Sequence, residues 1–235
     1  MVEQRLFSTL LAQVREKVIG CRLCPRLVEY RERIATEKRP ASRSETYWGR
    51  PVPGFGDPQA RLLILGLAPA AHGGNRTGRV FTGDASAQFL TSCLHEAAFA
   101  SQPMSEHLDD GLALRDAYIT AVVKCAPPQN RPTAEEAHNC RAYLMEELNA
   151  LPRVRAVLAL GRIAFEGYVQ GLEVLTGERH RLAFGHGVHY EMPQGPRHLF
   201  ASYHPSPHNT YTGRLKRGEL IALLLRVRAS LEEAS

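Results

Sequence analysis

The sequence predicts an α/β protein with three layers, α/β/α, around a short four-stranded parallel sheet. Four aliphatic runs have the length and composition of buried parallel strands, and helical patterns lie between them. Strands that alternate with helices favour a sheet covered on both faces, with its ligand site at the carboxyl ends of the strands. The four runs are residues 61–67, 117–123, 154–160 and 198–203.

The expected helices begin with one at about 3–18, and Pro25 then opens a short second helix. Residues 37–60 are rich in Pro, Gly and Arg and predict an irregular basic arm. Thr133, followed by acidic residues, is a suitable helix cap. The remaining helices are expected at about 84–100, 133–150, 162–171 and 213–232.

The size and composition of the chain fit one catalytic domain over residues 1–235. With 235 residues, 44% of them hydrophobic and 23% charged, the chain can bury a substantial core. Charged residues interrupt the apolar positions of its start, and no apolar run approaches a bilayer span. We therefore expect neither a signal peptide nor a membrane anchor, and a cytoplasmic location.

An excess of basic residues permits a polyanionic partner. The net charge is +5 and the isoelectric point is near 9.1. A solvated basic face is one explanation, but basic residues beside candidate catalytic loops favour nucleic acid. The excess is concentrated at Arg31, Arg33, Lys38, Arg39, Arg43 and Arg50, and beside two loops at Arg76, Arg79, Arg214, Lys216 and Arg217.

Four cysteines have the spacing of a metal or cluster site. Cys21 and Cys24 form a C-x-x-C pair, and Cys125 and Cys140 form a second pair about a hundred residues on. Two such pairs can close a four-sulfur site around an iron-sulfur cluster or zinc. Reduced thiols without a metal, or two disulfides, are the alternatives. The fifth cysteine, Cys93, lies in an apolar helical pattern and is expected to be a buried thiol.

A glycine-rich loop, residues 66–84, follows the first predicted strand. Its small residues let backbone amides approach a ligand, and a helix N-terminus follows it. This is typical of phosphate binding, although the spacing matches neither a P-loop nor a dinucleotide fingerprint. Phe81 is either a staple on the core or a platform for a flat base. Asp84 is either a helix cap or a functional carboxylate.

The fourth predicted strand runs into a second polar loop, residues 202–214. His204 lies where the strand meets the expected site, and Pro205 and Pro207 stiffen the chain after it. This loop faces the glycine-rich loop in such a sheet, which favours a catalytic or hydrogen-bonding role for His204 over a structural one. Side chains suited to phosphate contacts follow at Ser206, Asn209, Thr210 and Arg214.

Three motifs in this order, together with the four cysteines, resemble the uracil-DNA glycosylase superfamily. The motifs are the loop at 66–84, the stretch Lys124-Cys125-Ala126-Pro127-Pro128-Gln129-Asn130-Arg131-Pro132, and His204-Pro205-Ser206. The similarity covers roughly residues 21–217, and it is greatest to the iron-sulfur branch called family 5, or type B. It implies the α/β/α fold predicted above and a [4Fe-4S] cluster held by Cys21, Cys24, Cys125 and Cys140.

The resemblance also implies an activity. The protein is expected to be a monofunctional glycosylase that flips uracil, or another deaminated base such as hypoxanthine, out of DNA and hydrolyses its N-glycosidic bond. We expect it to be a monomer that acts in base excision repair. No lysine nucleophile is apparent at the site, so strand cleavage is not expected.

Catalytic roles follow from the resemblance. Residues 66–74 contain no carboxylate or amide, as in the type B branch, so the polar catalytic role moves to Asp84. Asn75 is the reserve candidate. His204 is expected to donate a hydrogen bond to the leaving base, and Asn130 to contact base or water.

Binding roles follow from the same resemblance. Phe81 is expected to stack on the flipped base. Backbone amides of Gly66, Leu67 and Ala68 are expected to add to base binding. Another branch has a base-reading Asn where this chain has Thr120-Ala121, so a preference wider than uracil is expected. Contacts to the DNA backbone are expected from Arg76, Ser206, Asn209 and Arg214.

Two other functions remain open on the sequence alone. The missing carboxylate in the first loop is compatible with a non-catalytic nucleic-acid-binding protein that has a degenerate glycosylase site. The glycine-rich loop is compatible with a nucleotide-binding α/β enzyme that has zinc at its cysteines. Colour distinguishes the zinc-containing nucleotide-binding enzyme from an iron-sulfur glycosylase, because a zinc protein is colourless and a [4Fe-4S] protein is brown.

Overall fold

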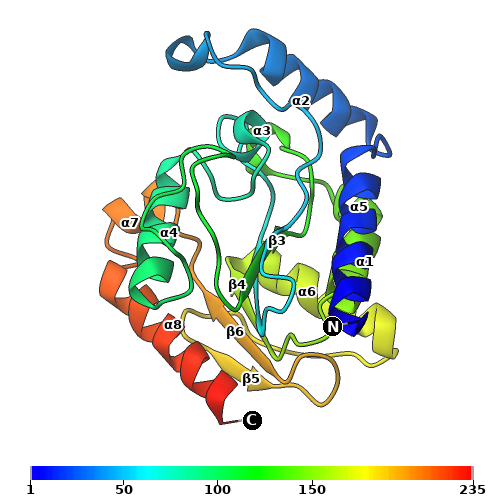
Figure 1. Cartoon of the computed structure of the whole chain (residues 1–235), viewed down its shortest axis with the longest axis vertical. Coiled ribbons are helices and arrows are strands. Elements are labelled where there is room, and N and C mark those ends of the chain that lie inside the picture. Colours follow the sequence, from blue (N-terminus) through cyan, green and yellow to red (C-terminus); the bar gives the residue numbers. More distant parts are fainter. Residues whose placement is uncertain (1, 234–235) are drawn as a thin grey trace.

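The computed structural model describes residues 2–233, which contain a mixed sheet of six strands (Figure 1). The strand order is β1-β3-β2-β4-β6-β5. The strands are β1 (Phe55–Gly56), β2 (Leu62–Gly66), β3 (Ala117–Ala121), β4 (Ala156–Leu160), β5 (His189–Glu191) and β6 (His198–Ser202).

The four inner strands, β3, β2, β4 and β6, are parallel, and every residue in them is buried. Burial on both faces explains their unbroken aliphatic sequences. The predicted four-stranded parallel sheet is therefore confirmed. The short edge strands β1 and β5 pair antiparallel with their neighbours and were not predicted. Neither contains an apolar run, because their side chains are exposed or half-buried.

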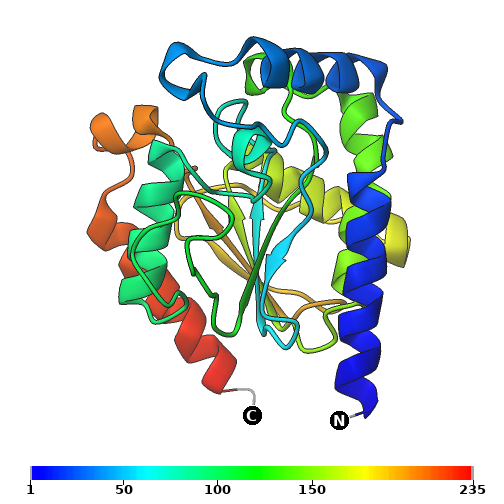
Figure 2. The same ribbon diagram turned by 45° about the horizontal axis from the view of Figure 1, so that its top comes forward.

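Helices cover both faces of the sheet (Figure 2), which confirms the predicted α/β/α layers. Side chains alternate along β2, so Leu62 and Ile64 pack with α4 and α8, whereas Leu63 and Leu65 pack toward α1, α5 and α6. The helices are α1 (Val2–Ile19), α2 (Pro25–Glu37), α3 (Gly74–Thr77), α4 (Ala85–Glu96), α5 (Ala134–Asn149), α6 (Arg162–Thr176), α7 (Pro207–Tyr211) and α8 (Arg217–Glu232), with 3-10 turns η1 (Pro40–Ser42) and η2 (Pro128–Asn130).

A capping box sets where α5 begins. Thr133 Oγ1 accepts a hydrogen bond from the Glu136 amide at 3.2 Å, and the Glu136 carboxylate accepts one from the Thr133 amide at 2.7 Å, a capping box for α5. Helices α3 and α7 were not predicted, because short helices inside polar loops lack an apolar period. Within residues 2–233, no helix is both long and apolar enough to span a bilayer.

A buried ion pair holds the basic arm against the core. Lys124 Nζ lies 2.6 Å from Glu147 Oε2, and these side chains are 1% and 2% exposed. The other Glu147 oxygen accepts a hydrogen bond from the Gly54 amide at 3.0 Å, and the Lys124 carbonyl accepts one from the Val52 amide at 2.7 Å. The arm is thereby fixed beside the segment that follows β3.

Candidate functional site

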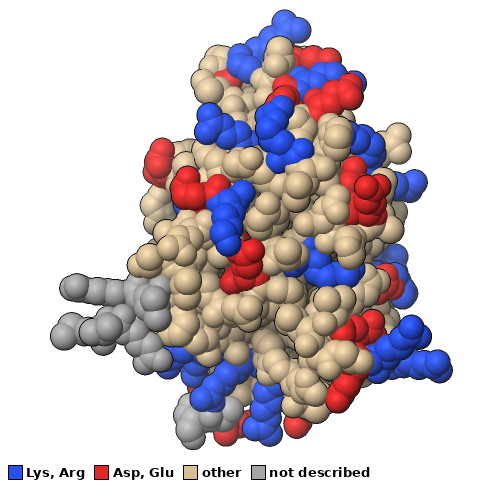
Figure 3. Space-filling view, turned by 90° about the vertical axis from the view of Figure 1, so that its right-hand side faces the viewer, with Lys and Arg blue, Asp and Glu red and all other residues tan. Residues whose placement is uncertain are grey.

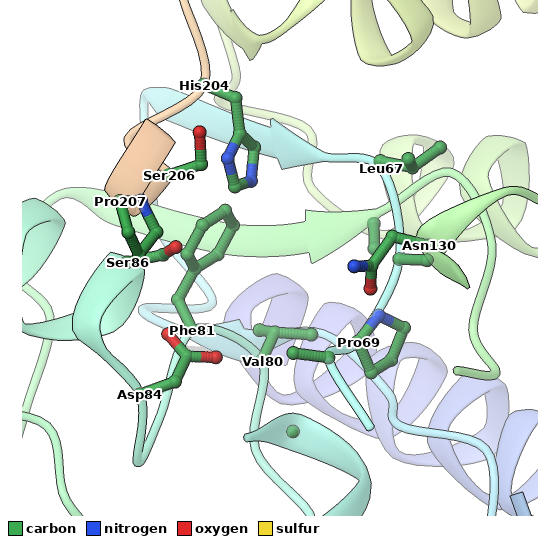
Figure 4. Close-up of a pocket in the computed structure, with 14 residues that line it drawn as sticks. Leu67, Pro69, Val80, Phe81, Asp84, Ser86, Asn130, His204, Ser206 and Pro207 are labelled. Atoms are coloured by element: carbon green, nitrogen blue, oxygen red, sulfur yellow. The ribbon is translucent and has the colours of Figure 1, made fainter. Parts of the chain in front are cut away.

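A cavity of about 280 Å³ opens at the carboxyl ends of the central strands, where the sequence predicts the ligand site (Figure 4). Its walls come from the loop after β2, the segment after β3 and the loop after β6. An apolar cavity with a few convergent polar groups is the usual composition of a binding site. The polar side chains in its lining are those of Asp84, Ser86, Asn130, His204 and Ser206.

Phe81 forms an aromatic wall of this cavity. A Cβ at Gly66 would lie 2.7 Å from Phe81 Cε2, so glycine at that position leaves room for the ring. The ring stacks with the imidazole of His204 at a centroid distance of 5.8 Å and an interplanar angle of 29°. Phe81 has φ of 46°, a left-handed conformation that is costly for a bulky residue and recurs at functional sites. Phe81 both packs on the core and faces the cavity.

His204 follows β6 and points into the cavity toward Phe81 (Figure 4). Burial lowers the pKa of His204 to about 4, because a charged imidazolium is disfavoured away from water. The ring is therefore neutral at physiological pH, and one of its nitrogens carries a proton that it can donate. The Asn209 side chain donates a hydrogen bond to the His204 carbonyl at 2.8 Å and fixes the backbone that carries the ring.

Asp84 caps a helix and also faces the cavity. Its Oδ1 accepts a hydrogen bond from the Ala87 amide at 2.9 Å and caps α4, and the carboxylate also lines the cavity. A Cβ at Gly73 would collide with Oδ2, so the glycine-rich loop closes tightly around this group. Burial raises the pKa of the Asp84 carboxyl, and the amides of Ala87 and Ser86 oppose that rise only in part.

Asn130 and Ser86 complete the polar lining. Asn130 has φ of 55° at the end of η2, and its side chain lies across the cavity from Ser86 and Phe81 (Figure 4). Ser86 is a lining residue that sequence reasoning missed. The position of Ser86 in the first turn of the helix that Asp84 caps could have indicated this role, because side chains near a helix cap lie in the same surroundings as the capping residue.

Asn75 and Arg76, predicted for catalysis and DNA contact, are not among the residues that line the cavity. Asn75 is fully buried, and its side-chain amide donates to the Arg31 carbonyl at 3.2 Å. The Arg76 guanidinium donates to the carbonyls of His72 and Gly83 at 2.9 Å each and pairs with Glu45. The structure therefore places both side chains within the scaffold of the glycine-rich loop.

The loop after β6 arranges the other predicted DNA-contact residues around α7. Ser206 caps α7 through the Asn209 amide and also lines the cavity. Arg214 is exposed and lies over the Tyr203 ring, 4.5 Å from its centroid. This loop lies next to His204, so its side chains are placed to contact a polymer that is bound at the cavity.

A buried network of hydrogen bonds around Arg79 holds the glycine-rich loop in place. Arg79, 3% exposed, donates to Asp110 at 2.6 Å, to Ser105 at 3.0 Å and to Thr82 at 2.9 Å. Burial opposes ionisation of Asp110, but Arg79 and two backbone amides outweigh it and lower the pKa of Asp110 to about 2. The network fixes both sides of Phe81. In the sequence, this network is indicated by an arginine in a loop where small residues predominate.

The four predicted ligand cysteines come together at one side of this site. Cys21 and Cys24 precede α2, Cys125 follows β3, and Cys140 lies in α5. Burial first, and then the nearby Cys21, raises the thiol pKa of Cys24, Cys125 and Cys140, so the four cysteines lie close together. All five cysteines are free, and Cys93 is buried as predicted. Within residues 2–233, no three Cys, His, Asp or Glu side chains are arranged to hold one metal ion.

Hydrogen-bond donors surround these sulfur atoms. Arg31 Nη1 donates to Cys125 Sγ at 2.9 Å, the Lys124 amide to Cys140 Sγ at 3.4 Å, and the Asn139 side chain to Cys24 Sγ at 3.6 Å. Burial raises the thiol pKa of Cys125 to about 12 and of Cys140 to about 11. Donors to sulfur and burial are features of iron-sulfur sites, where the metal itself displaces the thiol proton. This donor set fits a thiolate-bound cluster.

Comparison with known proteins places the whole arrangement in a family. A model described as the uracil DNA glycosylase superfamily matches residues 53–227. The chain belongs to this superfamily. The matched region contains the cavity, the loops that line it, and the second cysteine pair.

Within the superfamily, the chain is similar to several proteins named type-5 uracil-DNA glycosylase. It is 52% identical to the one from Thermus thermophilus, over 91% of this chain and 94% of that protein. It is 50% identical to the one from Pyrobaculum aerophilum, over 91% and 90%, and 48% identical to the one from Mycobacterium bovis, over 83% and 72%. The resemblance that the sequence motifs indicated is confirmed.

Proposed function

We propose that this protein excises uracil from DNA by hydrolysing the N-glycosidic bond, the reaction that the names of its relatives indicate for them. The observation that carries the proposal is the cavity in which Phe81, His204, Asp84 and Asn130 converge from three distant segments. An aromatic wall, a neutral donor and a carboxylate are the groups that this hydrolysis requires. A duplex hides the bond, so the nucleotide must first be flipped into the cavity, at a cost of about a few kcal/mol.

In the proposed reaction, Phe81 stacks on the flipped base and His204 acts on its leaving side. Negative charge develops on a base oxygen as the bond to deoxyribose breaks, and the neutral imidazole donates a hydrogen bond there. One preorganised donor to a developing oxyanion is worth about 2.7–4 kcal/mol. Amides of the loop that begins at Gly66 add to this stabilisation.

Asp84 acts on the sugar side in this proposal. The departing base takes the electron pair of the glycosidic bond, which leaves positive charge on the sugar. The Asp84 carboxylate stabilises that charge and orients the water that adds to the anomeric carbon. The proton released from this water passes to the carboxylate or to solvent. Asn130, on the opposite wall, contacts the base or the water.

The proposed reaction stops at the abasic site. Lysine is absent from the described cavity lining, so no amine is placed to form a covalent adduct with the sugar. A monofunctional glycosylase of this kind leaves the strand intact until alkali or another enzyme cuts it.

We extend the proposal to other deaminated bases such as hypoxanthine. Ala121, at the end of β3, contributes only a methyl group to the cavity lining and offers no side-chain hydrogen bond to the edge of a base. A site with few edge-reading contacts discriminates weakly among flat bases. Stacking on Phe81 accepts any aromatic base.

DNA approach is proposed along the loop after β6, where Ser206, Asn209 and Arg214 lie beside the cavity. A second basic region is visible in Figure 3, where several Lys and Arg side chains lie around α2 and the arm that follows it. Acidic side chains lie among them. Arg33, Arg43 and Arg50 are exposed in that region. Basic residues at both places support attraction to a phosphate backbone. A monomeric state and a cytoplasmic location stay predictions from the sequence.

We propose that Cys21, Cys24, Cys125 and Cys140 hold a [4Fe-4S] cluster. The sulfur ligands of such a cluster stand further apart than the four ligands of a zinc ion, because iron and sulfide lie between them. Hydrogen bonds donated to the sulfur atoms of Cys125 and Cys140 by Arg31 and by the Lys124 amide support a thiolate-bound cluster. When bound, the cluster would tie the α1–α2 connection to α5 and to the segment after β3.

The test is incubation of the purified protein with labelled oligonucleotides that carry one uracil or one hypoxanthine. Cleavage only after mild alkali is expected for uracil, and comparison of the two bases measures the preference. Cleavage without alkali would contradict the monofunctional mechanism. DNA binding without any base release would instead support a binding protein with a degenerate site.

A further inference from the structure

Arg31 of α2 is a buried cation that base excision does not use. Its side chain is 2% exposed, and among the side chains that the structure describes, residues 7–233, the one carboxylate within 4.0 Å of its guanidinium is Glu32, at 3.8 Å. The Glu32 side chain is 45% exposed and pairs more closely with Arg22, at 2.6 Å. A buried guanidinium with no buried counter-charge is strongly unfavourable. The fold must compensate this charge by other means.

The cysteine site lies against this cation. Arg31 Nη1 donates to Cys125 Sγ at 2.9 Å, and Nη2 donates to the carbonyl of Cys21 at 3.2 Å. A neutral thiol is a weak acceptor and carries no charge. A four-iron cluster with four thiolate ligands carries net negative charge. The guanidinium therefore finds its counter-charge when the cysteines hold the cluster.

The backbone of the same residue reaches the loop that shapes the cavity. The Arg31 carbonyl accepts a hydrogen bond from the Asn75 side chain at 3.2 Å. Asn75 is fully buried in α3, which packs against α2 (Figure 1). Its neighbour Gly74 lines the cavity, and Arg76 of the same turn donates to the Gly83 carbonyl next to Asp84.

We propose that Arg31 balances the charge of the cluster and, through Asn75, holds the glycine-rich loop in the shape that the base cavity requires. The proposal rests on the glycosylase function and on the cluster proposed above. Arg31 and Asn75 are positioning residues, because neither lines the cavity. A nearby cation and a hydrogen bond to a ligand sulfur both favour the more negative, reduced cluster. Arg31 therefore raises the reduction potential of the cluster.

The first measurement is the reduction potential of the cluster on an electrode, which supplies the electron. We compare the wild type with Arg31→Met and Arg31→Lys, and use Arg33→Met as the matched control on the exposed side of the same helix. The expected order of potentials is wild type and Arg33→Met highest, Arg31→Lys lower and Arg31→Met lowest. A tenfold change in the equilibrium constant of a one-electron reduction corresponds to about 59 mV.

The second measurement is hydrogen exchange over residues 72–84. Asn75→Leu is expected to speed exchange of this segment, because it removes the donor to the Arg31 carbonyl, whereas Arg33→Met leaves exchange unchanged. Asn75→Leu is also expected to leave the cluster potential unchanged, because it breaks the link without touching the sulfur site. This pattern separates the coupling from a general loss of stability.

A wild-type potential in Arg31→Met, or wild-type exchange of residues 72–84 in Asn75→Leu, would overturn the proposal. If Arg31→Met does not fold, Arg31→Lys decides: a lowered potential supports the proposal, and a wild-type potential overturns it. A colourless wild-type protein that excises uracil overturns this proposal and leaves the glycosylase function intact. A brown protein that shows the expected changes in potential and exchange but releases no base leaves this proposal intact and overturns the glycosylase function.

Discussion

Asp84 both caps α4 and lines the cavity, and two substitutions separate these roles. Asp84→Asn keeps a capping side chain, because Asn and Asp are comparable N-caps, but removes the charge. Asp84→Ala removes both the cap and the charge. The two variants are therefore expected to lose activity together and to differ in stability.

The structure sets the size of the stability effects. The cap hydrogen bond to the Ala87 amide is 2.9 Å long, and losing such a cap costs about 1 kcal/mol of the free energy of unfolding. For a protein of this size that places the Tm of Asp84→Ala about 2–4 °C below that of Asp84→Asn, because both variants lose the buried charge and only Asp84→Ala loses the cap. Asp84→Asn is expected to match or exceed the wild-type Tm at neutral pH, because burial penalises the wild-type carboxylate.

The pH dependence of this difference has a definite sign. Burial raises the pKa of folded Asp84, so the folded state holds the proton more tightly than the unfolded state. The wild type then loses stability as pH rises from the unfolded pKa through the folded pKa. The advantage of Asp84→Asn is expected at neutral pH and should disappear in acid, below both pKa values.

The assay pairs thermal unfolding with single-turnover release of uracil. Both variants are expected to slow release by about 10²–10⁴-fold, the usual contribution of a catalytic acid or base. Wild-type release by Asp84→Asn would refute the catalytic assignment and leave Asp84 as a cap alone. A Tm of Asp84→Asn as low as that of Asp84→Ala would refute the stability argument.

Three further predictions concern other parts of the site. His204→Asn should slow excision by about 10²–10³-fold while the fold and the colour persist. The rate of the wild type should show no histidine titration between about pH 6 and 9, because the pKa of His204 is about 4. A wild-type rate in His204→Asn would remove His204 from the mechanism. The Arg79–Asp110 pair lowers the pKa of Asp110 to about 2, so its stabilisation is present above the unfolded pKa and is lost as pH falls from about 4 toward 2; acid unfolding that is unchanged in Asp110→Asn would contradict this. Cys140→Ser should lose the brown colour and lower Tm, and a full visible spectrum in that variant would exclude Cys140 as a ligand.

The layers of the fold were predictable because burial on both faces leaves unbroken aliphatic strands. The edge strands β1 and β5 were not, because they are short and carry no apolar pattern. Phe81, Asp84 and His204 were predictable as site residues because each lies in a loop at the carboxyl edge of the sheet, whereas Asn130 was expected only from the resemblance to the superfamily. Their roles stay predictions.

Arg31, Asn75 and Arg76 mark the limit of sequence reasoning. Charge counting assigns Arg31 to a basic surface, yet α2 turns it inward onto the sulfur of Cys125. The short helix α3 likewise turns Asn75 and Arg76 into the scaffold of their own loop. Side-chain direction within a nonperiodic loop depends on tertiary contacts, which residue spacing does not encode.

The most direct test of the account is single-turnover release of free uracil from DNA, measured for the wild type and for His204→Asn at matched DNA occupancy. The account predicts rapid release by the wild type, an abasic strand that breaks only in alkali, and slow release by the variant with unchanged DNA affinity. Equal rates, or no release by the folded wild type, would contradict the claim that this cavity performs base excision.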